Sequence, residues 1–190
     1  MMKKQTQVLD IKDVDLNALG KANKLEEVVL SPVIGQFMAF NVGKECYALE
    51  INQVQEIVGW TGVTALPNTH DYMLGVLNLR GVVVPVFDLK CRFGGGTTEA
   101  TPTHVIIIVK VGNRVMGILV DVVSDIITVR QDQVKSISKS SKRGDKDFLL
   151  HHFMVEKRKI SQISIDTLFD LDNVFVNKKL NKNNKLKKKK

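Results

Sequence analysis

The sequence predicts an all-β fold in two halves, and three observations lead to this prediction. Valine and isoleucine are concentrated in short runs, and only 6% of the 190 residues are aromatic. Turn residues such as glycine, asparagine and lysine separate these runs, as expected between short strands. A stretch rich in glycine and threonine, 91–103, divides the runs into two groups of similar size. The chain is long enough to bury a real core.

The two ends of the chain differ from the middle in composition. Residues 1–33 mix charge with isolated apolar positions, and we expect a loosely ordered leader there with one short helix at 25–30. Eight of the 28 basic residues lie in 177–190, which has no acidic residue, so the remaining 20 basic residues balance 20 acidic ones. We expect 176–190 to be a disordered lysine-rich tail. It is either a solvated end or a contact with anionic membrane.

The first half begins with a predicted hairpin. Residues 36–42 and 45–51 read as two strands, and Gly43 and Lys44 form the turn between them. The apolar positions that follow, from Ile51 to Val58, are spaced for one face of a short helix. Residues 60–73 then read as a strand that is closed by a turn.

The stretch 73–90 organises the rest of the sequence. Two apolar runs flank Arg80 and Gly81, which predicts a hairpin whose turn presents an arginine. Pro85 lacks a backbone donor, so its strand should lie at an edge or turn that position away from a neighbouring strand. Asp88 is suited to cap a short helical turn that continues to Arg92.

The second half repeats the strand pattern. We expect a mobile loop at 91–103, and then a hairpin of 104–111 and 114–123 around a Gly-Asn turn. Residues 124–137 continue the sheet or form its return, and 138–147 make a polar loop. The last strands, 148–155 and 160–169, flank a turn at 156–159, with a closing helix near 166–171.

No catalytic or metal-binding pattern is present in the sequence. There is no GxSxG motif, the few histidines lack an evident nucleophile or acid partner, and we expect Asp121 and Asp125 to be solvated turn acids. Cys46 and Cys91 read as buried free thiols, and the adjacent histidines at 151–152 do not have metal-ligand spacing. We therefore expect no enzyme, no cofactor and no metal.

No apolar run approaches the roughly 18 residues that a membrane span needs, and no signal peptide is evident. We therefore expect a cytoplasmic protein that meets the membrane only through its partners.

The predicted hairpin also carries a family signature. Asparagine, leucine, arginine and glycine are followed after three apolar residues by proline, and then by aspartate and leucine. The matching residues are Asn78, Leu79, Arg80, Gly81, Pro85, Asp88 and Leu89, with Gly75 and Val76 in agreement just before them. This pattern resembles the signature of the CheW family, the coupling proteins of bacterial chemotaxis.

The resemblance covers about residues 34–175 and implies a fold of two SH3-like five-stranded barrels packed together, with short helices. The first barrel would span about 34–92 plus closing C-terminal elements, and the second about 103–165. The implied function is a chemotaxis adaptor between transmembrane chemoreceptors and the chemotaxis histidine kinase. The implied partners are the cytoplasmic tip of a chemoreceptor and the regulatory domain of the kinase, with a possible place in array rings.

The resemblance also assigns a candidate surface for coupling to receptor and kinase. Its residues are Val54, Glu56, Gly75, Asn78, Arg80 and Gly81. We hypothesise that Glu56 and Arg80 form a bidentate pair that fixes the receptor-binding loop. The alternative is two independent exposed charges.

Two other classes of protein are alternatives to the adaptor. A small β-barrel that binds nucleic acid through its basic tail is the main alternative, but the neutral body and the few aromatic residues argue against it, so we expect no nucleic-acid partner. A regulatory domain detached from a larger signalling protein is the other.

Overall fold

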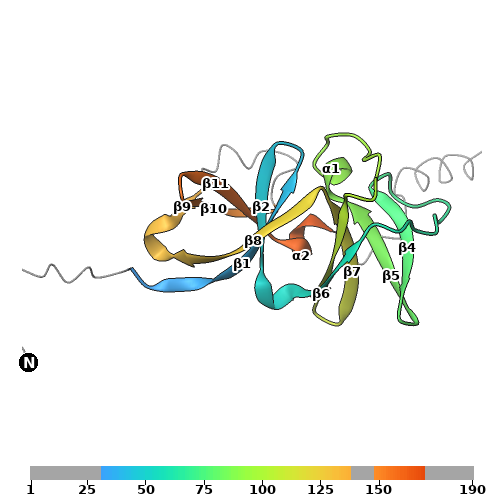
Figure 1. The fold of residues 1–190 in the computed structure, drawn as a ribbon, viewed down its shortest axis with the longest axis horizontal. Coiled ribbons are helices and arrows are strands. Elements are labelled where there is room, and N and C mark those ends of the chain that lie inside the picture. The colour runs from blue at the N-terminus through green and yellow to red at the C-terminus, as the bar shows by residue number, and fades with distance from the viewer. Residues whose placement is uncertain (1–30, 138–147, 170–190) are drawn as a thin grey trace, which may run out of the picture. The chain divides into compact units, whose positions relative to one another are not determined.

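The structure is a computed structural model that describes residues 31–137 and 148–169. These residues all belong to one compact unit, Ser31–Lys190. They form two β-sheets with a few short helices (Figure 1), which confirms the all-β prediction. The expected leader with its helix at 25–30, the polar loop at 138–147 and the lysine-rich tail lie outside the described residues.

One sheet has six strands and the other has five. The six-stranded sheet has the order β8-β1-β2-β11-β10-β9, formed by β8 (Val122–Arg130), β1 (Val33–Val42), β2 (Glu45–Glu50), β11 (Arg158–Ile163), β10 (Leu149–Val155) and β9 (Val134–Ser136). The five-stranded sheet has the order β3-β6-β7-β5-β4, formed by β3 (Val54–Gly59), β6 (Val105–Val111), β7 (Arg114–Val120), β5 (Val82–Asp88) and β4 (Met73–Leu79).

The strand pairing crosses the boundary that the sequence suggested between the two halves. β1 and β2 pair with β8 and β11, whereas β3, β4 and β5 share a sheet with β6 and β7. The six-stranded sheet also has one strand more than the five expected. Turn signals reveal consecutive hairpins, but the parallel contacts β2–β11 and β5–β7 join distant segments, and no local pattern specifies them.

Each sheet has a core of its own, and a third core lies between the sheets. In β1, Phe37 packs inside the six-stranded sheet and Phe40 in the shared core. In β6, Ile106 packs inside the five-stranded sheet and Ile107 in the shared core. Because both faces of these strands are covered, their sequences are continuous apolar runs instead of alternating ones. Full burial of such a side chain contributes about 1.5–3 kcal/mol.

Short helices complete the shared core. Helix α2 (Ile165–Leu168) begins at Ser164, whose hydroxyl accepts a hydrogen bond from the N–H of Thr167. Its buried residues belong to the shared core, and Figure 1 shows this helix between the two sheets. Helix α1 (Leu89–Arg92) begins at Asp88, which accepts from the N–H of Cys91 as predicted.

The helix expected at 51–58 is wrong. A short 3-10 helix, η3 (Ile51–Gln53), precedes strand β3, in which half-buried and exposed residues alternate and which pairs with β6. The apolar positions fit both periodicities over so few residues. The strand forms because β6 offers backbone partners to five of its six residues.

The segment between β3 and β4 and the loop after α1 also differ from expectation. Instead of a strand at 60–73, the structure has a single bridge between Thr64 and Val76. The loop expected to be mobile is fixed by the buried carboxylate of Asp88, which accepts from the N–H and the hydroxyl of Thr98 at 2.6 and 2.9 Å.

The two aspartates expected to be solvated also have structural contacts. Asp121 accepts from the N–H of Gly43 at 2.7 Å, and Asp125 pairs with Arg158 at 2.9 Å. The contact of Asp121 fixes the turn between β1 and β2 where the chain passes from β7 to β8. The free thiols Cys46 and Cys91 are half-buried, not fully buried, and burial raises the pKa of each.

Three of the predicted hairpins are confirmed in the two sheets. β1–β2, β6–β7 and β10–β11 form antiparallel pairs. The turn of the last is shorter than predicted and consists of Glu156 and Lys157. After β7 the chain crosses to the other sheet, where β8 pairs with β1 and is followed along the chain by η4 (Gln131–Gln133).

Candidate functional site

The tip of the β4–β5 hairpin presents the arginine predicted from the sequence. Arg80 has φ of 52° and Gly81 has φ of 89°, as in a two-residue turn of type I′. The side-chain Oδ1 of Asn78 accepts a hydrogen bond from the N–H of Gly81 at 2.8 Å. A left-handed backbone costs a residue other than glycine roughly 1 kcal/mol, so the fold tolerates strain to keep a charged side chain here.

Strand order explains how Glu56 comes to meet this tip. Glu56 lies in β3 and Arg80 follows β4, the two edge strands of the five-stranded sheet. The ladder between β3 and β6 has a register shift between Val54 and Glu56, and such a bulge redirects the side chain that follows it. The curvature of the sheet brings its two edges together, and an ion pair between Arg80 Nη2 and Glu56 Oε1, 2.7 Å apart, joins them.

The pair has one contact where the hypothesis had two, so it is not bidentate. The Arg80 side chain is 79% exposed and that of Glu56 is 29% exposed. An ion pair this exposed contributes only about 0–1 kcal/mol to stability. Its physical consequence is orientation, because it holds the guanidinium over the edge of β3 while leaving most of its surface accessible.

Pro85 fits the strand order through its orientation. β5 is an interior strand, but its ladder with β7 begins at Val86. Opposite Pro85, the N–H and C=O of Val76 bond to Thr64, both at 2.9 Å, so this position of the β4–β5 ladder needs no donor from β5. The second of the two predicted arrangements therefore holds. No backbone acceptor of a neighbouring strand is left waiting for a hydrogen bond from the nitrogen of Pro85.

Two of the predicted site residues are less accessible than the tip. Gly75 is buried with φ of 149°, and a Cβ there would lie 2.3 Å from the carbonyl oxygen of Thr64. Val54 is half-buried against the shared core. The structure thus brings Glu56, Asn78, Arg80 and Gly81 together at the tip, whereas Gly75 is buried and Val54 is half-buried against the shared core.

Sequence reasoning missed three exposed apolar side chains in β3 and β5. Ile57, Val82 and Val83 are 42, 58 and 66% exposed. Ile57 was hidden by the helix assignment, although alternation along β3 was the available signal. Val82 and Val83 follow the turn directly, and a short apolar run does not reveal which of its residues face solvent. An exposed apolar group beside an oriented charge is typical of a protein-binding surface.

The described residues offer no metal chemistry. Residues 31–137 and 148–169 hold no group of three or more His, Cys, Asp or Glu side chains that could bind a metal ion. His151 pairs with Gln162 and His152 with Ser161, each through its Nδ1. No helix within these residues is long and apolar enough to cross a membrane.

Comparison with known proteins adds the family. The model of the CheW-like domain matches residues 36–172. A probable chemotaxis protein CheW from Rhizobium etli is 40% identical over 134 residues, which cover 70% of this chain and 86% of that protein. The chemotaxis protein CheW of Bacillus subtilis is 31% identical over 67% of this chain and 81% of its own length.

A solved structure agrees with the sequence comparison. The crystal structure of the scaffolding protein TtCheW from Thermoanaerobacter tengcongensis matches with a TM-score of 0.64 and 29% identity, over 72% of this chain and 92% of that one. These similarities favour the adaptor over the nucleic-acid-binding alternative. The chain belongs to the CheW family, and it is a non-enzymatic scaffold of chemotaxis signalling.

Proposed function

We propose that this protein couples chemoreceptors to the chemotaxis histidine kinase in the cytoplasm, and that the Arg80 tip is part of its working surface. We define the coupling surface as the half-buried Glu56 together with the exposed Asn78, Arg80 and Val82. The observation that carries the proposal is the exposed arginine at the hairpin tip, held by Glu56, with the exposed Val82 directly after the turn.

The chemistry of the coupling surface suits a helical partner. A receptor tip is a helical hairpin in this family, and such a helix would place an apolar side chain on the exposed Val82, which directly follows the turn. A carboxylate or a backbone carbonyl at the partner's helix end would accept from the free nitrogens of Arg80. The adaptor would then shift kinase activity by binding one receptor or kinase state more tightly than the other.

The test is a reconstitution with receptor-containing membranes and the kinase. Co-sedimentation and kinase autophosphorylation are measured with the wild-type protein and with Arg80→Glu. We expect the wild type to join both partners and to raise kinase activity, and Arg80→Glu to lose at least about tenfold in binding, as expected for reversal of a charge at an interface.

Arg158→Glu is the matched control, because Arg158 is also an exposed arginine paired with a carboxylate but lies in the other sheet. It should retain coupling. Circular dichroism and melting curves of both variants check that the fold survives. Equal coupling by wild type and Arg80→Glu would remove Arg80 from the working surface, and failure of the wild type to join either partner would contradict the adaptor function itself.

A further inference from the structure

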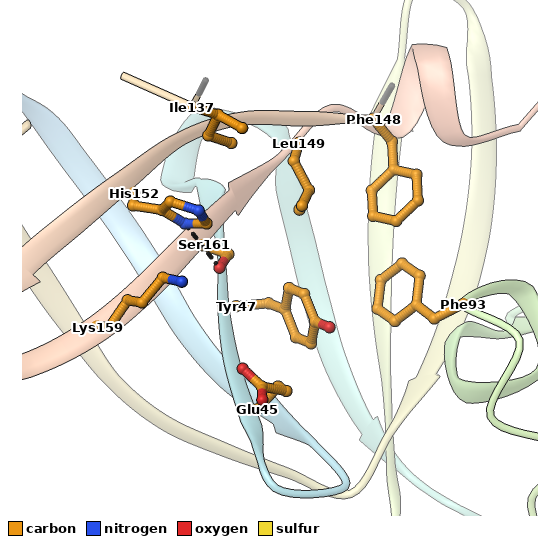
Figure 2. A pocket seen from close by; sticks show the side chains of 9 residues that line it. All are labelled: Glu45, Tyr47, Phe93, Ile137, Phe148, Leu149, His152, Lys159 and Ser161. Atoms are coloured by element: carbon orange, nitrogen blue, oxygen red, sulfur yellow. Dashed lines mark hydrogen bonds between the residues drawn. The ribbon is translucent and has the colours of Figure 1, made fainter. Parts of the chain in front are cut away.

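A second site lies away from the coupling surface, in a cavity of about 490 Å³ on the six-stranded sheet. Strands β2, β10 and β11 provide part of its lining, and Phe93, which follows α1, closes one side (Figure 2). The volume falls within the range of about 300–1,000 Å³ that is typical of small-molecule sites.

One side of this cavity is a wall of three aromatic rings. The ring centroids of Tyr47 and Phe93 are 4.7 Å apart, and those of Phe93 and Phe148 are 4.8 Å apart with only 13° between their planes. In Figure 2, Phe93 and Phe148 stand on the side opposite His152 and Lys159, and the ring of Tyr47 lies between them. Such a wall favours a flat or bulky apolar group.

The cavity also carries one positive and one negative charge. Tyr47 pairs with Ser161 across the parallel strands β2 and β11. Glu45 and Lys159 lie two residues earlier on these strands, so both point to the same side of the sheet as that pair. Both line the cavity, and neither belongs to an ion pair within residues 31–137 and 148–169.

The remaining polar groups of the cavity are neutral near pH 7. Burial and the nearby Lys159 lower the pKa of the His152 imidazole, and its Nδ1 shares a hydrogen bond of 3.0 Å with the hydroxyl of Ser161. Burial and the Glu45 carboxylate raise the pKa of the Tyr47 phenol. Lys159 and Glu45 are therefore the two charges that an occupant would meet.

We propose that this cavity binds a zwitterionic α-amino acid with a large apolar side chain. Its carboxylate would accept from Lys159, its ammonium would donate to Glu45, and its side chain would lie against Phe93 and Phe148. A ligand with only one sign of charge would be attracted by one of the two residues and repelled by the other. This inference is independent of the coupling function, since it uses none of the coupling surface.

Calorimetric titration of the full chain with four probes tests the proposal. The probes are L-phenylalanine, 3-phenylpropionate without the ammonium, phenethylamine without the carboxylate, and glycine without the apolar body. We expect saturable binding of L-phenylalanine and at least about tenfold weaker binding of each of the others, because each lost charge-assisted hydrogen bond or buried ring contributes on the order of 1.4 kcal/mol or more.

Variants then assign the binding to this cavity. Lys159→Met and Glu45→Gln should each weaken L-phenylalanine binding by about tenfold. Lys110→Met, which removes an exposed lysine of β6 outside the cavity, should leave it unchanged. No saturable binding of L-phenylalanine would mean that Glu45 and Lys159 only face each other across the strands, and would overturn the proposal. Equal binding of the singly charged probes, or unchanged binding in both cavity variants, would overturn it as well.

Discussion

The hairpins β4–β5 and β10–β11 are built alike, one in each sheet, but their tips differ in what they leave accessible. Both turns have two residues with positive φ, 52° and 89° at Arg80 and Gly81, and 50° and 65° at Glu156 and Lys157. The first turn has a glycine at its second position and the second turn has none. The β10–β11 turn therefore carries backbone strain at two residues instead of one.

An arginine at each hairpin reaches a carboxylate on a strand that is not its neighbour. Arg80 contacts Glu56 at 2.7 Å, and Arg158 contacts Asp125 at 2.9 Å. The hydrogen bond and the charge of Asp125 raise the pKa of Arg158, which also lies 3.7 Å from Glu156. Arg80 is 79% exposed and Arg158 is 42% exposed. The same kind of ion pair thus leaves the side chain of Arg80 far more accessible than that of Arg158.

The largest effect should come from the base of the β4–β5 hairpin. Gly75→Ala places a Cβ 2.3 Å from the backbone oxygen of Thr64 at a φ of 149°, and we expect a loss of about 3 kcal/mol in the free energy of unfolding. The β10–β11 hairpin has no glycine, so it has no position without a Cβ where another backbone segment could approach as closely as Thr64 approaches Gly75. Urea denaturation measures the change.

Gly43→Ala is the matched control for this prediction. Gly43 also has positive φ, 61°, but no atom lies within 4 Å of a Cβ there. It should lose only about 1 kcal/mol, the cost of the backbone conformation alone. Equal losses for the two variants would show that the approach of Thr64 does not constrain the hairpin.

The next effect separates the two arginine pairs by function. In the double variant Glu56→Arg with Arg80→Glu, an ion pair can still form, so stability should stay within about 1 kcal/mol of the wild type. Kinase stimulation should nevertheless stay at least about tenfold below it, because the partner meets the opposite charge. The corresponding exchange of Asp125 and Arg158 should leave stimulation intact. Recovery of stimulation by the first exchange would mean that only the ion pair matters, and not the identity of the exposed charge.

These two hairpins also show which features of the fold can be predicted from the sequence. Short apolar runs and turn residues predicted both hairpins, because turn chemistry and alternation are local properties. The type of the β10–β11 turn was not predicted, since Glu156 and Lys157 carry no signal for positive φ. The contact of Arg80 with Glu56 was hypothesised from the family resemblance, but its single-contact geometry depends on the curvature of a whole sheet.

The largest miss, β3, has a physical cause. Its residues fit a helix as well as a strand. The strand forms because it pairs with β6, which lies about fifty residues later in the chain. The same cause hid Ile57 and the parallel pairings that mix the two halves. Pairing between distant segments is decided by the packing of the complete core.

A smaller effect is expected from the strain in the β10–β11 turn. Lys157→Gly removes the cost of a left-handed lysine, so we expect stability to rise by about 0.5–1 kcal/mol. Thermal melting would show a higher midpoint. Glycine is already present at the second position of the β4–β5 turn, so Gly81→Lys is the reverse experiment and should lower the midpoint by a similar amount. An unchanged midpoint in Lys157→Gly would mean that this turn carries no strain to relieve.

The smallest effect concerns pH and distinguishes the hairpins by a titrating group. Burial and Lys159 lower the pKa of His152 in β10, whereas β4–β5 contains no histidine. As pH falls below about 6.5, the ordinary value for histidine, the unfolded chain takes up a proton before the folded protein does. Stability contributed by neutral His152 is therefore complete above that pH and declines below it.

Urea denaturation between about pH 7 and 5 should show this decline in the wild type and less of it in His152→Gln. Met154→Gln, a substitution at an exposed neighbour in β10, is the control and should show the same decline as the wild type. Parallel curves for wild type and His152→Gln would contradict the effect and would show that the pH dependence does not distinguish the two hairpins.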